Sequence, residues 1–146
     1  GLTAEVQVGD VLKLPAGQYD AVLLDAPCSA TGTIRRHPDL PFAKQGDGIS
    51  ELIALQAKML IAAAKQVKPG GRLVFCTCSL IPDEGEVQAE TFLAANPDFS
   101  VDATLPAGMD PDWRTEEGGL RLRPDYWSEI GGMDGFYIIR MNRAET

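Results

Sequence analysis

The sequence lacks the long apolar runs of a membrane protein and the positive charge of a freestanding nucleic-acid binder. No apolar run approaches the ~18 residues that a membrane span needs, and no basic start leads into a secretory hydrophobic segment. Lysine and arginine number 13 against 21 aspartate and glutamate residues, which gives a net charge of -8. Because RNA-binding proteins usually carry a basic face, any RNA affinity must come from a local patch or another domain.

Cysteine and histidine are also scarce. The three cysteines are Cys28, Cys76 and Cys78, and the one histidine is His37. An odd cysteine count, with two of them only two positions apart, indicates a reduced, cytoplasmic protein. Cys-x-Cys with two remote single ligands does not match the paired spacing of structural zinc sites, so no metal is expected.

What is present is an ordinary globular composition. The 146 residues are 45% apolar and 23% charged, enough for one domain with a modest core. The chain begins at Gly1 rather than at a methionine. We therefore expect residues 1–146 to be a single piece of a longer protein.

Strand and helix patterns alternate along the chain. An apolar run at 18–25 reads as a strand buried on both faces of a parallel sheet. Ser50 is a candidate N-cap for a helix that runs to about Val67 and stops at residues 69–71, and a second helix is expected at 83–95. Further strands are predicted at 4–8, 72–78 and 99–101, and as an edge pair at 120–123 and 136–142.

This order predicts an α/β sheet in which two strands end at one ligand-binding edge. Asp25 ends one strand and is followed by Cys28. Cys78, fifty positions after Cys28, ends the next strand. We expect Cys76, which lies deeper in its strand, to be packing. For a single cysteine at a strand end, buried packing is the more frequent role, and acids such as Asp10 and Asp25 often only cap turns. The combination favours a reactive site.

These same residues carry a family resemblance. Residues 22–32 (VLLDAPCSATG) and 70–79 (GGRLVFCTCS) resemble motifs IV and VI of the Sun/NOL1/NOP2 (RsmB-like) RNA cytosine-5 methyltransferases. The stretches RRHPDLPF and GGMDGFYIIRM also fit that pattern. The resemblance covers about Asp10 to Met141 and implies a Rossmann-like class I methyltransferase fold that uses S-adenosylmethionine to modify RNA, with ribosomal RNA the default.

The resemblance also implies residue roles. Cys78 would attack carbon 6 of cytosine, which makes carbon 5 nucleophilic, and Cys28 would assist the later release of the base. Asp25 would face both the methyl donor and the cytosine, with Asp10 and Pro27 also at the donor. Arg35 and Arg36 are less specific candidates for an RNA contact. Gln56 also matches the family pattern, although a solvent-facing helix position is at least as frequent for such a residue. Residues 134–136 match a motif whose role is mainly structural.

Part of the family pattern is missing. No glycine-rich loop opens a helix after a strand, as a nucleoside-binding loop must. We therefore expect an incomplete sheet that lacks its first two strands, with residues 20–25 at an exposed edge that favours self-association. Alone, such a piece would be inactive and bind S-adenosylmethionine weakly.

Two other functions stay open. A thiol hydrolase needs a histidine near its cysteine, and His37 follows Cys28 rather than Cys78. A non-catalytic binding or scaffold piece, with purely structural cysteines, is the alternative outside enzymes.

Overall fold

The computed structural model describes residues 1–43, 46 and 48–145. Its strands are β1 (Tyr19–Asp25), β2 (Val67–Thr77), β3 (Phe99–Val101), β4 (Leu120–Leu122) and β5 (Phe136–Arg143). Its α-helices are α1 (Leu40–Ala43), α2 (Ile49–Ala64) and α3 (Glu86–Ala95). Short 3-10 helices are η1 (Val11–Lys13), η2 (Thr31–Thr33), η3 (Pro82–Glu84), η4 (Pro111–Trp113) and η5 (Ser128–Ile130).

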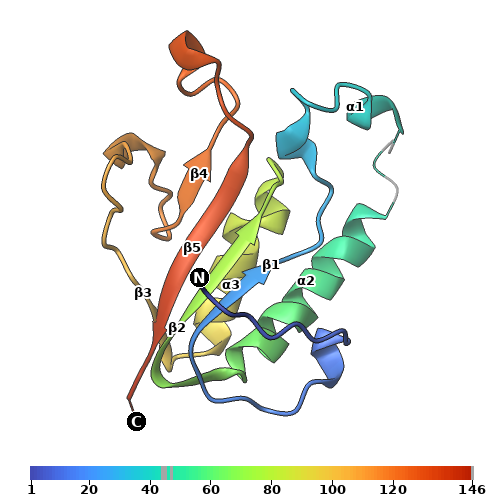
Figure 1. The fold of residues 1–146 in the computed structure, drawn as a ribbon. Helices are drawn as coiled ribbons and strands as arrows, with labels where there is room; N and C mark the ends of the chain where they lie inside the picture. The colour runs from blue at the N-terminus through green and yellow to red at the C-terminus, as the bar shows by residue number, and fades with distance from the viewer. Residues whose placement is uncertain (44–45, 47, 146) are drawn as a thin grey trace.

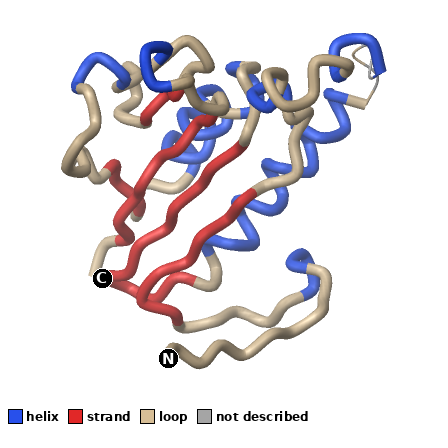
Figure 2. Tube along the Cα trace, turned by 45° about the horizontal axis from the view of Figure 1, so that its top comes forward, coloured by secondary structure: helices blue, strands red, loops and turns tan. Residues whose placement is uncertain are grey.

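The strands form one mixed sheet, with α2 and α3 behind it in the view of Figure 1. The strand order is β1-β2-β5-β3, and β4 also pairs with β5. Strands β1 and β2 are parallel, whereas β5 is antiparallel to β2, β3 and β4. The strands run side by side as one layer in Figure 2. The α/β class is as predicted, but β5 is an interior strand rather than a member of an edge pair.

One face of the sheet carries the core. Leu73 and Phe75 of β2 lie opposite Met141 and Ile139 of β5, and all four are at most 1% exposed. Alternate residues project from the other face, where Arg72 is exposed. Burying each large apolar side chain contributes about 1.5–3 kcal/mol. The sheet is therefore held mainly by the face on which the helices pack.

Strand β1 is half exposed, which corrects the prediction that it is buried on both faces. Leu24 is 6% exposed and packs in the core, but Leu23 is 69% exposed. The sheet order places β1 at an edge, as expected for residues 20–25. A helix covers one face only, so alternate apolar residues of β1 remain accessible.

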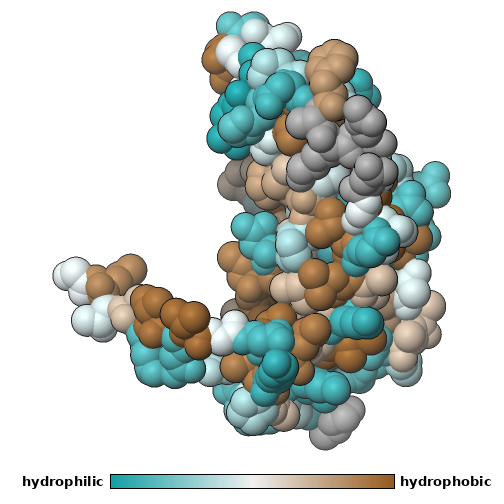
Figure 3. Space-filling view, turned by 90° about the vertical axis from the view of Figure 1, so that its right-hand side faces the viewer, coloured by the Kyte–Doolittle hydropathy of each residue, from teal (hydrophilic) through white to brown (hydrophobic). Residues whose placement is uncertain are grey.

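The N-terminal segment is not a strand, so the prediction for residues 4–8 is wrong. Leu2, Val6 and Val8 are almost fully exposed, and the segment extends away from the body of the molecule as an arm (Figure 3). A strand forms only where a neighbour satisfies its backbone groups. Among the described residues, none pairs with this segment.

Two boundaries also differ from the predictions. Gly48, with a left-handed φ of 79°, occupies the N-cap of α2, and Ser50 lies within the helix. Strand β2 begins at Val67, which pairs with Tyr19, and residues 69–71 bulge from the ladder instead of ending a helix. Between β1 and α2 lie η2 and α1, while positions 44, 45 and 47 lie outside the described residues. None of the described helices is both long and apolar enough to span a bilayer.

Candidate active site

The loops that follow β1 and β2 bring two cysteines together. The Sγ atoms of Cys28 and Cys78 lie 3.5 Å apart. Because β1 and β2 are parallel neighbours, their carboxyl ends reach the same edge of the sheet. Both side chains are partly exposed. The paired thiols are therefore accessible from solvent.

Backbone hydrogen bonds fix the two loops against each other. The Gly32 amide donates to the Cys78 carbonyl over 2.9 Å, and the Gly135 amide donates to the Gly32 carbonyl over 2.8 Å. A Cβ atom at Gly32 would lie only 2.0 Å from the Gly135 oxygen. Glycine is thus required at position 32, because the Cys28 loop packs closely against Gly135.

Cys28 is held as a neutral thiol. Burial is the main cause that raises its pKa to about 12, and the neighbouring Cys78 and the Glu84 carboxylate act in the same direction. A protonated Cys28 can donate its S–H to the Cys78 sulfur. The geometry therefore suits a reactive thiol that has a second thiol as hydrogen-bond donor.

Cys76 has a different partner. It lies opposite Asp25 in the β1–β2 ladder, and its Sγ is 3.7 Å from Asp25 Oδ1. Burial, and then the Asp25 carboxylate, raise the pKa of Cys76 to about 12. Cys76 is thus a buried thiol, as expected for packing, but it also contacts a residue of the candidate site. Asp25 itself is exposed beyond this contact.

The other residues assigned to the methyl donor do not all gather at this edge. Pro27 does: it is exposed in the same loop, and its carbonyl accepts from Gln56 Nε2 over 2.8 Å. Asp10 caps η1, with Oδ1 accepting from the Leu12 amide over 3.0 Å. Since η1 packs on α2 near the start of β1 (Figure 1), Asp10 lies away from the cysteines. The predicted strand that was to carry Asp10 to the edge does not form.

The two arginines after the Cys28 loop differ in their contacts. Arg36 Nη2 lies 2.6 Å from Asp134 Oδ2, and its Nε donates to the same oxygen over 2.8 Å. Arg35 lies against Gly132. Both arginines are exposed, and so is His37. Among the described residues no hydrogen bond joins the His37 side chain to a cysteine, and no group of three or more potential ligands gathers at a metal-binding distance.

Sequence reasoning missed the polar residues beneath the cysteines. Glu84 is fully buried and accepts hydrogen bonds from Ser29, Ser79 and Gln56. Gln56 is also fully buried, so the solvent-facing alternative for it is wrong. Arg121 of β4 donates to the Ser79 carbonyl and pairs with Glu86. The sequence signals for this layer were the family-pattern match at Gln56 and the position of Ser29 and Ser79, each next to a predicted active-site cysteine.

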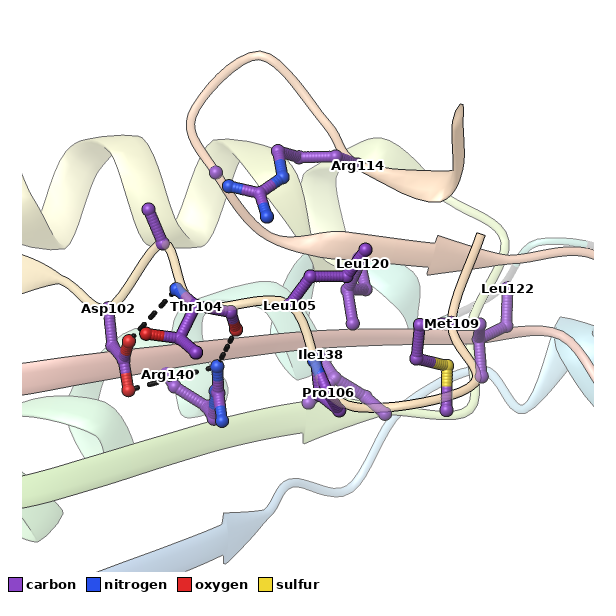
Figure 4. A pocket seen from close by; sticks show the side chains of 12 residues that line it. Asp102, Thr104, Leu105, Pro106, Met109, Arg114, Leu120, Leu122, Ile138 and Arg140 are labelled. Carbon is purple, nitrogen blue, oxygen red and sulfur yellow. Dashed lines mark hydrogen bonds and ion pairs between the residues drawn. The ribbon is translucent and has the colours of Figure 1, made fainter. Parts of the chain in front are cut away.

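A separate pocket is lined by β4, β5 and the segment after β3. Its volume is about 110 Å³. Arg140 at its mouth bonds to Asp102 and to the Thr104 carbonyl (Figure 4). The lining is otherwise largely apolar, from Leu105, Pro106, Met109, Leu120, Leu122 and Ile138. None of the three cysteines lines this pocket.

The fold is an α/β sheet in which a parallel strand pair presents two thiols at its carboxyl edge, the arrangement expected from the family resemblance. The profile of the family described as "16S rRNA methyltransferase RsmB/F" matches residues 2–142. The chain belongs to this family. The family resemblance predicted from the Pro-Cys and Thr-Cys elements is thereby confirmed.

Known relatives agree. Ribosomal RNA small subunit methyltransferase B of Vibrio cholerae is 42% identical over 97% of this chain and 31% of its own length. The Shewanella oneidensis protein of the same name is 39% identical over 98% of the chain and 32% of its own length. The chain thus spans about a third of these relatives.

Solved structures share the fold. The crystal structure of PH0851 superposes with a TM-score of 0.74 at 38% identity, over 85% of this chain and 26% of that one. NSun6 from Pyrococcus horikoshii, solved with SFG, gives a TM-score of 0.71 at 25% identity, over 97% of this chain and 34% of that one. The Rossmann-like sheet expected from the sequence is confirmed.

Proposed function

We propose that this chain is the base-attacking part of an S-adenosylmethionine-dependent ribosomal RNA cytosine-5 methyltransferase. The observation that carries the proposal is the Cys28–Cys78 pair, with Sγ atoms 3.5 Å apart at the carboxyl edge of the sheet. Family membership supports ribosomal RNA as the substrate. The proposal assigns Cys78 as the nucleophile and Cys28 as the thiol that assists release.

The reaction begins with the Cys78 thiolate, which adds to carbon 6 of cytosine. The electron pair of the C5–C6 double bond then makes carbon 5 nucleophilic. We assign Asp25, whose side chain is exposed at the end of β1, the role of hydrogen-bonding the cytosine N3 edge. After methylation, water at the open edge of the sheet takes the proton from carbon 5. The C5–H electron pair re-forms the C5–C6 double bond, and the C6–S bond breaks with its electrons returning to Cys78. Cys28 assists from beside the departing sulfur, which its S–H can hydrogen-bond.

The methyl donor fits this chain in part. S-adenosylmethionine supplies the electrophilic methyl group when bound. We assign the donor contacts to Asp25 and Pro27, which are exposed at the end of β1 and in the loop after it, whereas Asp10 caps η1. NSun6 was solved with SFG, an analogue of this donor, which supports the same cofactor here. We expect the 146-residue chain alone to bind the donor weakly and not to turn over.

The test is a methylation assay on the complete protein that carries this chain, with 16S rRNA and mass-spectrometric detection of 5-methylcytosine. Cys78→Ser is expected to lower the rate by at least about a hundredfold, because oxygen cannot replace the thiolate. Cys76→Ser, the matched control, retains most of the activity. Equal activity of both variants would favour the alternative function, a binding or scaffold piece whose cysteines are structural.

A further inference from the structure

Beneath the two cysteines lies a carboxylate that the proposed chemistry does not use. Glu84 ends η3 and is 0% exposed. An ionised carboxylate is seldom buried unless hydrogen bonds replace its water. The hydrogen-bond donors around Glu84 therefore show which segments of the chain its carboxylate connects.

Four donors from three segments converge on Glu84. The Ser29 amide donates to Oε1 over 2.9 Å and the Ser29 hydroxyl donates to Oε2. The Ser79 hydroxyl also donates to Oε2, and Gln56 Nε2 donates to Oε1 over 3.0 Å. Ser29 directly follows Cys28, and Ser79 directly follows Cys78. One carboxylate therefore joins both cysteine loops to helix α2.

Neighbouring contacts strengthen the same junction. The hydroxyls of Ser29 and Ser79 lie 3.2 Å apart, and the Thr77 hydroxyl donates to the Glu84 carbonyl over 2.9 Å. Gln56 also donates to the Pro27 carbonyl, on the other side of Cys28. Each bond reaches a residue beside a thiol rather than a thiol itself.

The charge state of Glu84 fits this arrangement. Burial alone would raise its pKa, but the hydrogen bonds from Ser29, Ser79 and Gln56 outweigh burial and lower it. The carboxylate is thus ionised at neutral pH. Its negative charge is also one of the influences that keep Cys28 protonated.

We infer that Glu84 is the positioning residue of the thiol pair: its carboxylate sets the distance between Cys28 and Cys78 by tying Ser29 to Ser79. This inference rests on the proposed function for its catalytic consequence. Its geometric consequence stands independently, since the separation of the two thiols can be measured without methyl transfer.

The experiment uses the complete protein that carries this chain and compares wild type, Glu84→Gln and Glu90→Gln. The last variant removes the same charge from an exposed position of α3 and serves as the matched control. Two quantities are measured well below the unfolding temperature. One is the rate at which oxidised glutathione joins Cys28 to Cys78, two thiols being oxidised as one glutathione disulfide is reduced. The other is the steady-state rate of cytosine methylation.

Glu84→Gln is expected to slow formation of the Cys28–Cys78 disulfide at least tenfold and to lower kcat at least tenfold with KM for RNA nearly unchanged. Glu90→Gln matches wild type in both. A residue that only stabilised the fold would alter neither at a temperature where the protein is folded. Wild-type disulfide and methylation rates in folded Glu84→Gln overturn the inference.

A second variant decides the matter if Glu84→Gln does not fold. Ser79→Ala keeps the carboxylate and removes one of its links, so it should slow disulfide formation in the same direction by a smaller factor. An unchanged rate in Ser79→Ala would then refute the positioning role. Failure of the proposed function is distinguishable, because it would appear as full methylation by Cys78→Ser, whatever the disulfide rates of these variants.

Discussion

Cys28 and Cys78 are fifty positions apart in the chain, yet their sulfur atoms lie 3.5 Å from each other. Parallel pairing of β1 and β2 accounts for this proximity, because each thiol follows the carboxyl end of its strand. Cys76, only two residues before Cys78, instead contacts Asp25. The three thiols thus have separate environments, which makes them separately testable.

Mild oxidation should link only one pair of cysteines. A small movement of the loops would bring the Cys28 and Cys78 sulfur atoms from 3.5 Å to the ~2.05 Å of a disulfide. With oxidised glutathione, peptide mapping should find the Cys28–Cys78 link with Cys76 still free. Cys28→Ser should abolish the link and Cys76→Ser should not. A Cys76–Cys78 link as the main product would contradict the arrangement.

Two of the thiols should react slowly at neutral pH. The pKa values of Cys28 and Cys76 are raised to about 12, mainly by burial. Because the thiolate is the nucleophile, the rate at which iodoacetamide labels each of these cysteines should rise about tenfold for each unit by which the pH increases toward 12. Their raised pKa values also stabilise the fold below the reference pKa, a contribution lost as the pH rises toward 12.

Site-resolved mass spectrometry measures these rates, with the urea-unfolded chain as control. Unfolding removes the burial, so both cysteines should then titrate near the ordinary value of ~8.5. A labelling rate for either folded cysteine that levels off near pH 9 would show that burial does not protect it.

The two arginines should contribute unequally to RNA binding. Arg36 is paired with Asp134, whereas the contact of Arg35 is with Gly132. The binding constant K of the complete protein that carries this chain for a cytosine-containing oligoribonucleotide can be measured at several salt concentrations. Arg35→Ala should reduce the slope of log K against log salt concentration by about 1. Asp134→Asn, which frees Arg36, should strengthen binding. Lys58→Ala on the exposed face of α2 is the control, and equal effects of Arg35→Ala and Lys58→Ala would remove the RNA role.

The exposed edge of the sheet should promote self-association of the 146-residue chain. Leu23 of β1 is 69% exposed at this edge. Burying a leucine contributes about 1.5–3 kcal/mol, so Leu23→Lys should raise the concentration needed for association at least about tenfold. Light scattering after size-exclusion chromatography measures it. Ile61→Lys, an equally drastic change on α2, should have little effect, and a monomeric wild type at all concentrations would end this proposal.

The sequence located the cysteine loops because apolar runs mark strands and strand ends mark loops. The run before Asp25 and the run before Cys78 are both strands, and their parallel pairing follows from the helix between them. Burial of Leu24 and Phe75 fixes the register. Local pattern and global fold agree at these positions.

Other features depended on information beyond local pattern. Residues 4–8 alternate like a strand, but alternation alone provides no pairing partner. The sequence around Glu84 is typical of the solvent-exposed start of a helix. Only the tertiary fold brings Ser29 and Gln56 to its carboxylate. Hydrogen-bond partners separated by 55 and 28 positions leave no periodic signal in the sequence.

The central claim is that Cys78 bonds to cytosine while Cys28 assists release. The most direct measurement is a denaturing gel of the complete protein that carries this chain, incubated with 16S rRNA and S-adenosylmethionine. Cys28→Ala should accumulate a covalent protein–RNA complex, and Cys28→Ala combined with Cys78→Ala should form none. A covalent complex that persists in the double variant, or none in Cys28→Ala, would contradict the account.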